Sequence, residues 1–205
     1  EPVYGGTEFL IRNILPKFGI TPVAFGGSSG RRSVKEAIAK ATGMGPIGMI
    51  FIETPANPTN ALIDIGASAK AARKLAGQKR GRPLVAVDNT MLGPLWQQPL
   101  ELGADMALYS LTKYVGGHSD IVAGACLGAE EHLAAVRGMR TILGTISDPH
   151  TGWLVMRSLE TLKLRMTSAM KNARYVAEYL ADHPKVATVH YLGFVDEEHP
   201  DFALR

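Results

Sequence analysis

The chain has 205 residues, of which 46% are hydrophobic and 20% are charged, a composition typical of a globular protein with a sizeable core. Its net charge is +3, and the basic residues are dispersed along the chain. They form no basic stripe interleaved with aromatic residues, so nucleic-acid binding is not expected. No apolar run approaches the roughly 18 residues of a membrane-spanning helix, and neither a membrane segment nor a signal peptide is predicted.

The first 46 residues predict two helices separated by a short strand. An apolar-periodic run follows a glycine-containing turn, and a second such run follows a Gly/Ser-rich loop. The expected elements are a turn at 4–7, a helix at 7–15, a strand at 21–25, a loop at 26–32 and a helix at 33–42 that Ser33 caps.

From residue 47 onward, apolar runs of strand length alternate with helical patterns. Continuous apolar runs of this kind indicate strands buried on both faces, as in parallel sheets. The expected strands are 47–53, 84–87, 105–110, 121–127 and 186–189, and the expected helices are 64–76, 130–143, 149–168 and 170–181. The alternation predicts an α/β fold of three layers, in which a mainly parallel sheet is flanked by helices. We expect one domain over 1–163 and the start of a second over 164–205.

Polar side chains follow three of the expected strands where each one ends. Glu53 leads into a proline-rich loop that contains Asn57. Asp88 ends the second strand, and Ser110 ends the third just before Lys113. Ligands of open parallel sheets bind beyond the carboxyl ends of the strands. If the three strands are neighbours, these residues meet at one edge of the sheet.

The residue types at these positions are those that pyridoxal phosphate (PLP) requires. Lys113 offers an amine for a Schiff base, and Ser110 and Thr112 offer hydroxyls for a phosphate group. Asp88 offers a carboxylate that holds the pyridine nitrogen protonated. Each also has an ordinary alternative, since most lysines are exposed surface groups and an aspartate after a strand often caps a helix or pairs with an arginine.

Other site chemistries lack their motifs. Neither GxxxxGK[ST] nor GxGxxG after a strand is present, so phosphate-loop and dinucleotide sites are not expected. Three consecutive residues, His118, Ser119 and Asp120, cannot readily converge as a catalytic triad. The six histidines form no HExxH or Cys/His cluster, so no metal site is predicted. A lysine Schiff-base enzyme without PLP, such as an aldolase, stays an alternative.

Several spaced segments carry a family resemblance over nearly the whole chain. They are FIETPANPT at 51–59, VDNT at 87–90, SLTKYVGGHSD at 110–120, VAG at 122–124, TLKLRM at 161–166 and the segment 183–193. In this order they resemble the PLP-dependent enzymes of cysteine and methionine metabolism, which include cystathionine γ-synthases, cystathionine γ- and β-lyases, methionine γ-lyases and sulfhydrylases. The resemblance implies the large domain of the PLP-dependent transferase fold type I, truncated at both ends.

The resemblance implies the residues that hold the cofactor ring. Lys113 matches the lysine that carries PLP covalently, and Asp88 matches the partner of the pyridine nitrogen. Asn57 matches the asparagine near the 3′-oxygen of the cofactor. Tyr4 matches the tyrosine that stacks on the ring and is often assigned proton transfer, which makes Tyr4 and Lys113 the expected catalytic residues.

The resemblance also implies how the cofactor phosphate is bound. Ser110 and Thr112 match the phosphate-binding hydroxyls. Leu111, Val115 and Gly116 depart from the commonest family residues, at places that vary within the family. The family's glycine-containing phosphate loop, the tyrosine and arginine that reach a neighbouring subunit's phosphate, and the arginine that binds the substrate carboxylate are expected outside these 205 residues.

The activity implied is elimination or replacement at the β or γ carbon of a small sulfur-containing amino acid in transsulfuration. We expect γ-elimination or γ-replacement, and Gly6 is compatible with the cystathionine-type members of the family, whereas many methionine γ-lyases place a cysteine there. Alternatives are cystathionine β-lyase, methionine γ-lyase or O-acylhomoserine sulfhydrylase activity, or an inactive fragment with only a structural or cofactor-binding role. The family implies a homotetramer of dimers, and the single Cys126, which excludes an intrachain disulfide, suits a cytoplasmic location.

Overall fold

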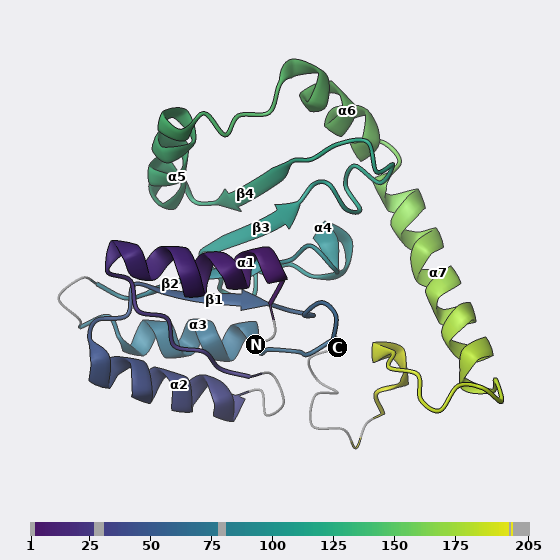
Figure 1. Cartoon of the computed structure of the whole chain (residues 1–205), viewed down its shortest axis with the longest axis horizontal. Helices are drawn as coiled ribbons and strands as arrows, with labels where there is room; N and C mark the ends of the chain where they lie inside the picture. The colour runs from purple at the N-terminus through teal and green to yellow at the C-terminus, as the bar shows by residue number, and fades with distance from the viewer. Residues whose placement is uncertain (1–2, 27–30, 78–80, 197, 199–205) are drawn as a thin grey trace.

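The computed structural model describes residues 3–26, 31–77, 81–196 and 198, and within them four strands form one mixed sheet (Figure 1). The strands are β1 (Met49–Glu53), β2 (Leu84–Asp88), β3 (Met106–Ser110) and β4 (Gly124–Gly128), and they lie in the order β1-β2-β3-β4. The first three run parallel, and β4 runs antiparallel to β3. The α/β class with a mainly parallel sheet is therefore confirmed.

Helices flank this sheet. They are α1 (Gly5–Phe9), which continues as helical turns over Leu10–Ile14 and Leu15–Phe18, then α2 (Arg31–Met44), α3 (Ile65–Lys74), α4 (Gly93–Trp96), α5 (Glu130–Leu143), α6 (Pro149–Leu159) and α7 (Leu162–Ala181), with a short 3-10 turn at Leu192–Phe194. Helix α3 packs against β1 and β2, and α2 packs on α3 (Figure 1). Helix α5 contacts β4, and α7 runs away from the sheet. No helix in the described ranges is long and apolar enough to cross a membrane.

The centre of the sheet is buried on both faces. Val85, Ala86 and Val87 are consecutive on β2 and are each at most 2% exposed, although successive side chains of a strand point to opposite faces. Val85 and Val87 belong to the main hydrophobic cluster with Ile52 of β1 and Ile65 of α3. The continuous apolar run of β2 thus has the burial expected of a central parallel strand.

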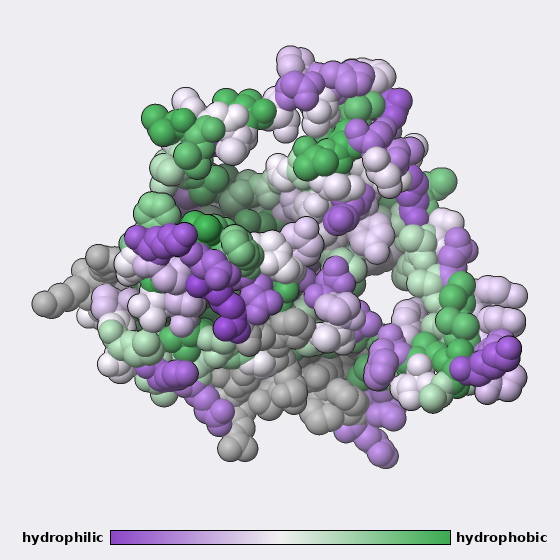
Figure 2. Space-filling view, in the orientation of Figure 1, coloured by the Kyte–Doolittle hydropathy of each residue, from purple (hydrophilic) through white to green (hydrophobic). Residues whose placement is uncertain are grey.

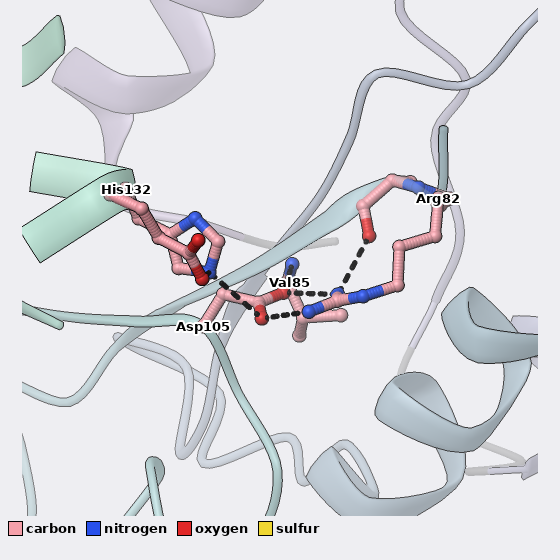
Figure 3. A network of polar contacts seen from close by, with 6 residues as sticks. Arg82, Val85, Asp105 and His132 are labelled. Carbon is pink, nitrogen blue, oxygen red and sulfur yellow. Dashed lines mark hydrogen bonds and ion pairs between the residues drawn. The ribbon is translucent and has the colours of Figure 1, made fainter. Parts of the chain in front are cut away.

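Asp105 ties the amino ends of β2 and β3 together (Figure 3). Its carboxylate accepts two hydrogen bonds from the Arg82 guanidinium, at 2.6 and 2.8 Å, and one from Val85 N at 2.8 Å. His132 Nε2 of α5 lies 3.5 Å from Oδ1 of the same carboxylate. Burial by itself raises the pKa of Asp105, but the hydrogen bonds from Arg82 and Val85 outweigh it and hold that pKa below its ordinary value.

A second hydrophobic cluster holds the turn that follows β3 against α6 and α7. Val115 from this turn packs with Leu162 and Met166 from the start of α7. Arg165 reinforces the contact, because its guanidinium donates to Tyr114 O at 2.6 Å and to Val115 O at 3.0 Å. The turn is thereby fixed from outside the sheet by both apolar packing and main-chain hydrogen bonds.

Arg165 also acts where α6 ends and α7 begins. A single helix was expected over 149–168, but the structure divides it at Glu160 and Thr161. Ser158 O accepts hydrogen bonds from Thr161 N and from Arg165 Nη2, and Arg165 Nε donates to Thr161 Oγ1. These local contacts redirect the chain without a glycine or proline, so the apolar period gives no sign of the break.

Position 117, next to the Arg165 guanidinium, requires glycine. Gly117 has φ +75°, and a Cβ at this position would overlap the Arg165 guanidinium. A left-handed backbone beside a bulky side chain is a place where only glycine fits without strain.

Two expected strands are wrong. The segments 21–25 and 186–189 do not form strands, because no described strand lies beside them to complete a ladder and Pro22 lacks an N–H to donate. The first helix begins at Gly5 with Tyr4 as its N-cap residue, rather than at Thr7. Helix α2 begins at Arg31, so Ser33 lies inside it, and residues 27–30 of the expected loop lie outside the described residues.

The other elements lie close to their expected places. Asp64 caps α3 by accepting a hydrogen bond from Ala67 N at 2.7 Å, and α5 spans the expected residues. A four-residue helix, α4, occupies part of the connection expected after β2. The domain boundary placed after Lys163 falls at the start of α7 and stays a prediction.

Replacing Asp105 by asparagine is expected to lower the free energy of unfolding by about 2–3 kcal/mol at pH 7. The estimate is below the roughly 3–5 kcal/mol for breaking a fully buried ion pair, because the Arg82 side chain is 35% exposed. Urea denaturation of the wild type and the variant measures it. Glu130→Gln is the matched control, since its ion pair with Arg137 is fully exposed and should contribute little.

The Asp105 effect should also depend on pH. A carboxylate whose folded-state pKa is lowered stabilises the protein above its unfolded pKa of about 3.9, and this stabilisation disappears as the pH falls through the folded value. The stability difference between wild type and Asp105→Asn should therefore shrink as the pH falls below about 3.9. A difference that stayed constant from pH 7 to pH 2 would contradict the assigned role.

Replacing Arg165 by methionine is expected to loosen the turn after β3. The amides of Gly116 and Gly117, which donate to Leu111 O and Lys113 O, should exchange with solvent about tenfold faster or more. Hydrogen-exchange mass spectrometry or NMR measures the rates. The matched control is Arg174→Met on the same helix, because Arg174 forms an exposed pair with Glu178 one turn along that helix and should leave exchange in the turn after β3 unchanged.

Candidate functional site

The carboxyl ends of β1, β2 and β3 lie side by side. Glu53 at the end of β1 pairs in register with Asp88 at the end of β2. Asp88 in turn pairs with Leu108, two residues before Ser110 on β3. The sequence-based expectation that these three strand ends meet at one edge is confirmed.

Lys113 lies in the turn that begins where β3 ends. Its main-chain N donates to Ser110 O at 3.1 Å, and Gly117 N donates to Lys113 O at 2.8 Å. The strand conformation therefore ends at Ser110, so the simple alternation that would put Ser110 and Thr112 on one side of a strand does not extend to Thr112.

The two carboxylate oxygens of Asp88 have different surroundings. Oδ1 accepts hydrogen bonds from Thr90 N at 3.0 Å and from Thr90 Oγ1 at 2.6 Å. Oδ2 has no hydrogen-bond or ion-pair partner among the described residues. Asp88 is thus neither paired with an arginine there nor used as a helix cap, and one oxygen is left for a ligand.

A hydrogen-bonded path links Asp88 to the lysine turn. Thr90 Oγ1 donates to Asp88 and accepts a hydrogen bond from Ser110 N at 2.8 Å. Ser110 O then accepts from Lys113 N. Asp88 and Lys113, although 25 positions apart in the printed sequence, therefore belong to the same edge of the sheet.

The two candidate phosphate-binding hydroxyls, those of Ser110 and Thr112, differ in their hydrogen bonds. The side chains of Ser110 and Lys113 have no polar partner within the described ranges. Thr112 Oγ1, in contrast, accepts a hydrogen bond from Ala123 N at 3.0 Å and donates to Ala123 O at 3.3 Å. The Thr112 hydroxyl must turn its proton away from Ala123 before it can donate to an anion.

Glu53 joins the segments that carry Tyr4 and Asn57. Its Oε2 accepts from Tyr4 N at 2.6 Å, and its Oε1 accepts from Asn57 N at 2.9 Å. Glu53 is only 6% exposed, whereas the side chains of Tyr4 and Asn57 are exposed and have no polar partner in the described part of the chain. A buried carboxylate thus positions the main chain of two residues whose side chains remain available.

The amide side chains of Asn89 and Gln97 connect the segments that follow the strands at the carboxyl edge of the sheet. Asn89 is fully buried, and its Nδ2 lies 3.0 Å from each of Gly93 O, Gln97 O and Tyr109 Oη. Gln97 Nε2 donates to Asn89 Oδ1 at 2.7 Å and to Thr54 O at 2.8 Å. Residues next to all three strand ends are therefore connected through one pair of amide side chains.

The side chains without partners fit the groups of PLP. An amine, a carboxylate oxygen, a hydroxyl and an amide at one edge match the aldehyde, ring nitrogen, phosphate and 3′-oxygen that the cofactor presents. His118 Nδ1 lies 2.7 Å from Gly116 O within the same turn, which suits a structural role for this histidine. Within the described residues, no three His, Cys, Asp or Glu side chains are grouped as metal ligands.

Cys126 on β4 lies apart from this chemistry. It is half-buried and free, and burial raises the pKa of its thiol. A thiol with a raised pKa carries less thiolate at neutral pH, so Cys126 is a poor nucleophile.

Sequence reasoning missed the residues that hold the site together. Thr90 and Asn89 lie inside the VDNT segment, and Arg165 lies inside TLKLRM, so their segments were noticed without a role for each side chain. Glu53 was noticed only as a polar strand end. Gln97 lies in the segment between β2 and β3, where no sequence motif indicates a role for it.

Comparisons with known proteins identify the family to which the chain belongs. The profile of a family described as "Cys/Met metabolism PLP-dependent enzyme" matches residues 1–205. Cystathionine gamma-lyase of Bacillus subtilis is 40% identical over 205 residues, covering 100% of this chain and 50% of that protein. Cystathionine gamma-synthase of Mycobacterium leprae is 38% identical over 208 residues, covering 100% of this chain and 50% of that protein.

A solved structure gives the same result for the fold. The cystathionine gamma-lyase from Lactobacillus plantarum, complexed with L-serine, superposes with a TM-score of 0.85 at 36% identity, covering 98% of this chain and 50% of that one. The chain thus spans about half the length of the relatives it matches. With a family profile matching from the first residue to the last, the chain belongs to the PLP-dependent enzymes of Cys/Met metabolism.

Proposed function

We propose that the full-length protein uses PLP to eliminate or replace the γ-substituent of a sulfur-containing amino acid. The observation that carries the proposal is the set of groups at the strand ends without a partner among the described residues: Asp88 Oδ2, the Ser110 hydroxyl and the Lys113 amine. The names of the relatives, a cystathionine gamma-lyase and a cystathionine gamma-synthase, favour γ chemistry.

The proposed cofactor contacts follow from these positions. When bound, PLP supplies an electron-withdrawing ring that stabilises negative charge at the substrate α-carbon. Asp88 Oδ2 would accept a hydrogen bond from the protonated ring nitrogen, and the Ser110 hydroxyl, with that of Thr112 after reorientation, would donate to the phosphate. Asn57 contacts the 3′-oxygen, and Lys113 is the point of covalent attachment.

Two residues are proposed to move protons. Lys113 Nζ has no carboxylate partner in the described part of the chain, so its amine is free to take a proton from the substrate α-carbon and return it elsewhere. Tyr4 is held by its main chain to Glu53, and its ring is exposed and available to stack on the cofactor. Tyr4 Oη would assist proton transfer towards the leaving group.

The glycine after Tyr4 bears on specificity. A Cβ at Gly6 would lie 2.8 Å from Tyr4 Cε1, so any larger residue at position 6 must displace the tyrosine ring. We propose that Gly6 lets this ring keep a position suited to a cystathionine-sized substrate.

We also propose that the full-length protein is a cytoplasmic homotetramer built from dimers. Large apolar side chains are exposed on the helices beyond β4, as the green areas of Figure 2 show. They include Met139, Ile142 and Leu143 on α5, and Trp153 and Met156 on α6. Exposed apolar surface of this kind is usually covered by other protein, here by further subunits or by the second half of the protein.

The cofactor assignment is tested by replacing Lys113 with alanine in the full-length protein. In the wild type, borohydride should fix the cofactor to the peptide that contains Lys113, which mass spectrometry detects as an added mass. The variant should show neither this added mass nor the absorbance band of the bound cofactor. Lys40→Ala, at an exposed position on α2, is the matched control and should retain both. A wild type that takes up no PLP would favour a fragment without cofactor chemistry or an enzyme of the aldolase type.

The substrate assignment is tested by product analysis. The full-length enzyme should release a four-carbon 2-oxo acid from cystathionine, or join O-acylhomoserine to cysteine, because both reactions proceed at the γ-carbon. Mass spectrometry of the products with cystathionine, methionine, cysteine and O-acylhomoserine distinguishes these activities. A three-carbon 2-oxo acid from cystathionine would indicate β-elimination and contradict the γ assignment.

A further inference from the structure

Among the residues that the structure describes, one residue, Thr90, makes the hydrogen bonds that hold the Asp88 carboxylate. Both hydrogen bonds to Oδ1 come from this residue, one from its main-chain N and one from its hydroxyl. Because Oδ1 is occupied in this way, the orientation of the carboxyl group is set and Oδ2 is the oxygen left to face a ligand. Thr90 lies only two residues after Asp88, so both hydrogen bonds are local to the end of β2.

The direction of the Thr90 hydroxyl is also set. A hydroxyl has one proton to donate and lone pairs to accept. Ser110 N donates to Thr90 Oγ1 at 2.8 Å, so the single Thr90 proton is directed to Asp88 Oδ1 at 2.6 Å. A side chain of the same shape without the hydroxyl would leave the Ser110 amide and the Asp88 carboxylate each short of one hydrogen bond.

The main chain that carries Thr90 is rigidly supported. Asn89 N donates to Leu108 O at 2.9 Å, which joins the end of β2 to β3. The buried Asn89 side chain is held in turn by Gly93, Gln97 and Tyr109. A polar group that must orient a ligand contact works best on such a fixed support.

We propose that Thr90 is the positioning residue of the cofactor site: it turns Asp88 Oδ2 towards the ring nitrogen of PLP and couples that contact, through Ser110 N, to the residue that binds the phosphate. This inference rests on the proposed use of PLP. Thr90 itself touches neither substrate nor cofactor. It acts through Asp88 at one end of the ring and through Ser110 at the other.

The test measures cofactor affinity in the full-length apo-protein. Equilibrium titration compares PLP with its 1-deaza analogue, in which carbon replaces the ring nitrogen. Thr90→Val should weaken PLP binding about ten- to hundredfold, as expected for the loss of a hydrogen bond to a charged group. The same variant should lose at least about threefold less affinity for the analogue than for PLP, because the analogue offers Asp88 no ring nitrogen and retains only the phosphate contact that depends on Ser110.

Two control variants accompany the measurement. Thr90→Ser keeps the hydroxyl and should retain PLP affinity within about threefold, since only a methyl group is lost. Thr42→Val makes the same chemical change on the exposed face of α2, where the hydroxyl donates to Ile38 O, and should have no effect on either ligand.

Each outcome decides the proposal. Unchanged PLP affinity in Thr90→Val, or equal loss for PLP and the analogue, would overturn it, because the first shows no role and the second shows only a structural one. If Thr90→Val does not fold by circular dichroism, Thr90→Ala is judged by the same two affinities. In an Asp88→Asn background Thr90→Val should cause a smaller loss of PLP affinity than in the wild type, because only the effect through Ser110 remains. A wild type that bound no PLP would instead refute the proposed function.

Discussion

The parallel pairing of β1, β2 and β3 is the constraint on which the site depends. In-register pairing places Glu53 beside Asp88 and brings the end of β3 next to Asp88 on its other side. A shift of one residue in either pair would move every side chain of the shifted strand to the opposite face. The Arg82–Asp105 contact at the amino ends and the Asn89–Gln97 amide pair at the carboxyl ends both connect neighbouring strands and so resist such a shift.

The polar groups at the carboxyl edge of the sheet are of two kinds. Asp88 Oδ2, Ser110 and Lys113 have side-chain atoms without partners in the described part of the chain, and these are the groups assigned to the cofactor. Thr90 and Glu53 have their oxygens engaged with main-chain amides and other protein groups, and they set the positions of the first kind. A preformed site needs both, because a ligand contact is only as well placed as the group that orients it.

The predictions succeeded where local sequence determines structure. The runs that form β1, β2 and β3 are apolar and end in a polar residue, and their burial follows from that pattern. Asp64 was identified as a helix start because a capping carboxylate acts within its own turn. The expected strands at 21–25 and 186–189 failed because a strand exists only where a partner completes its hydrogen bonds. The break between α6 and α7 was missed because it depends on Arg165.

Residue type and spacing along the chain were enough to indicate the fold class, the family and the candidate residues Lys113 and Asp88. The strand order, the antiparallel direction of β4 and the contacts of Thr90, Glu53 and Arg165 became visible in the folded chain. Strand pairing joins main-chain groups to one another, and the contacts of Thr90 with Ser110, of Glu53 with Tyr4 and of Arg165 with Tyr114 join side chains to main-chain groups 20 or more positions away in the sequence. A main-chain amide or carbonyl is the same at every position, so no residue pattern announces which one a side chain will bind.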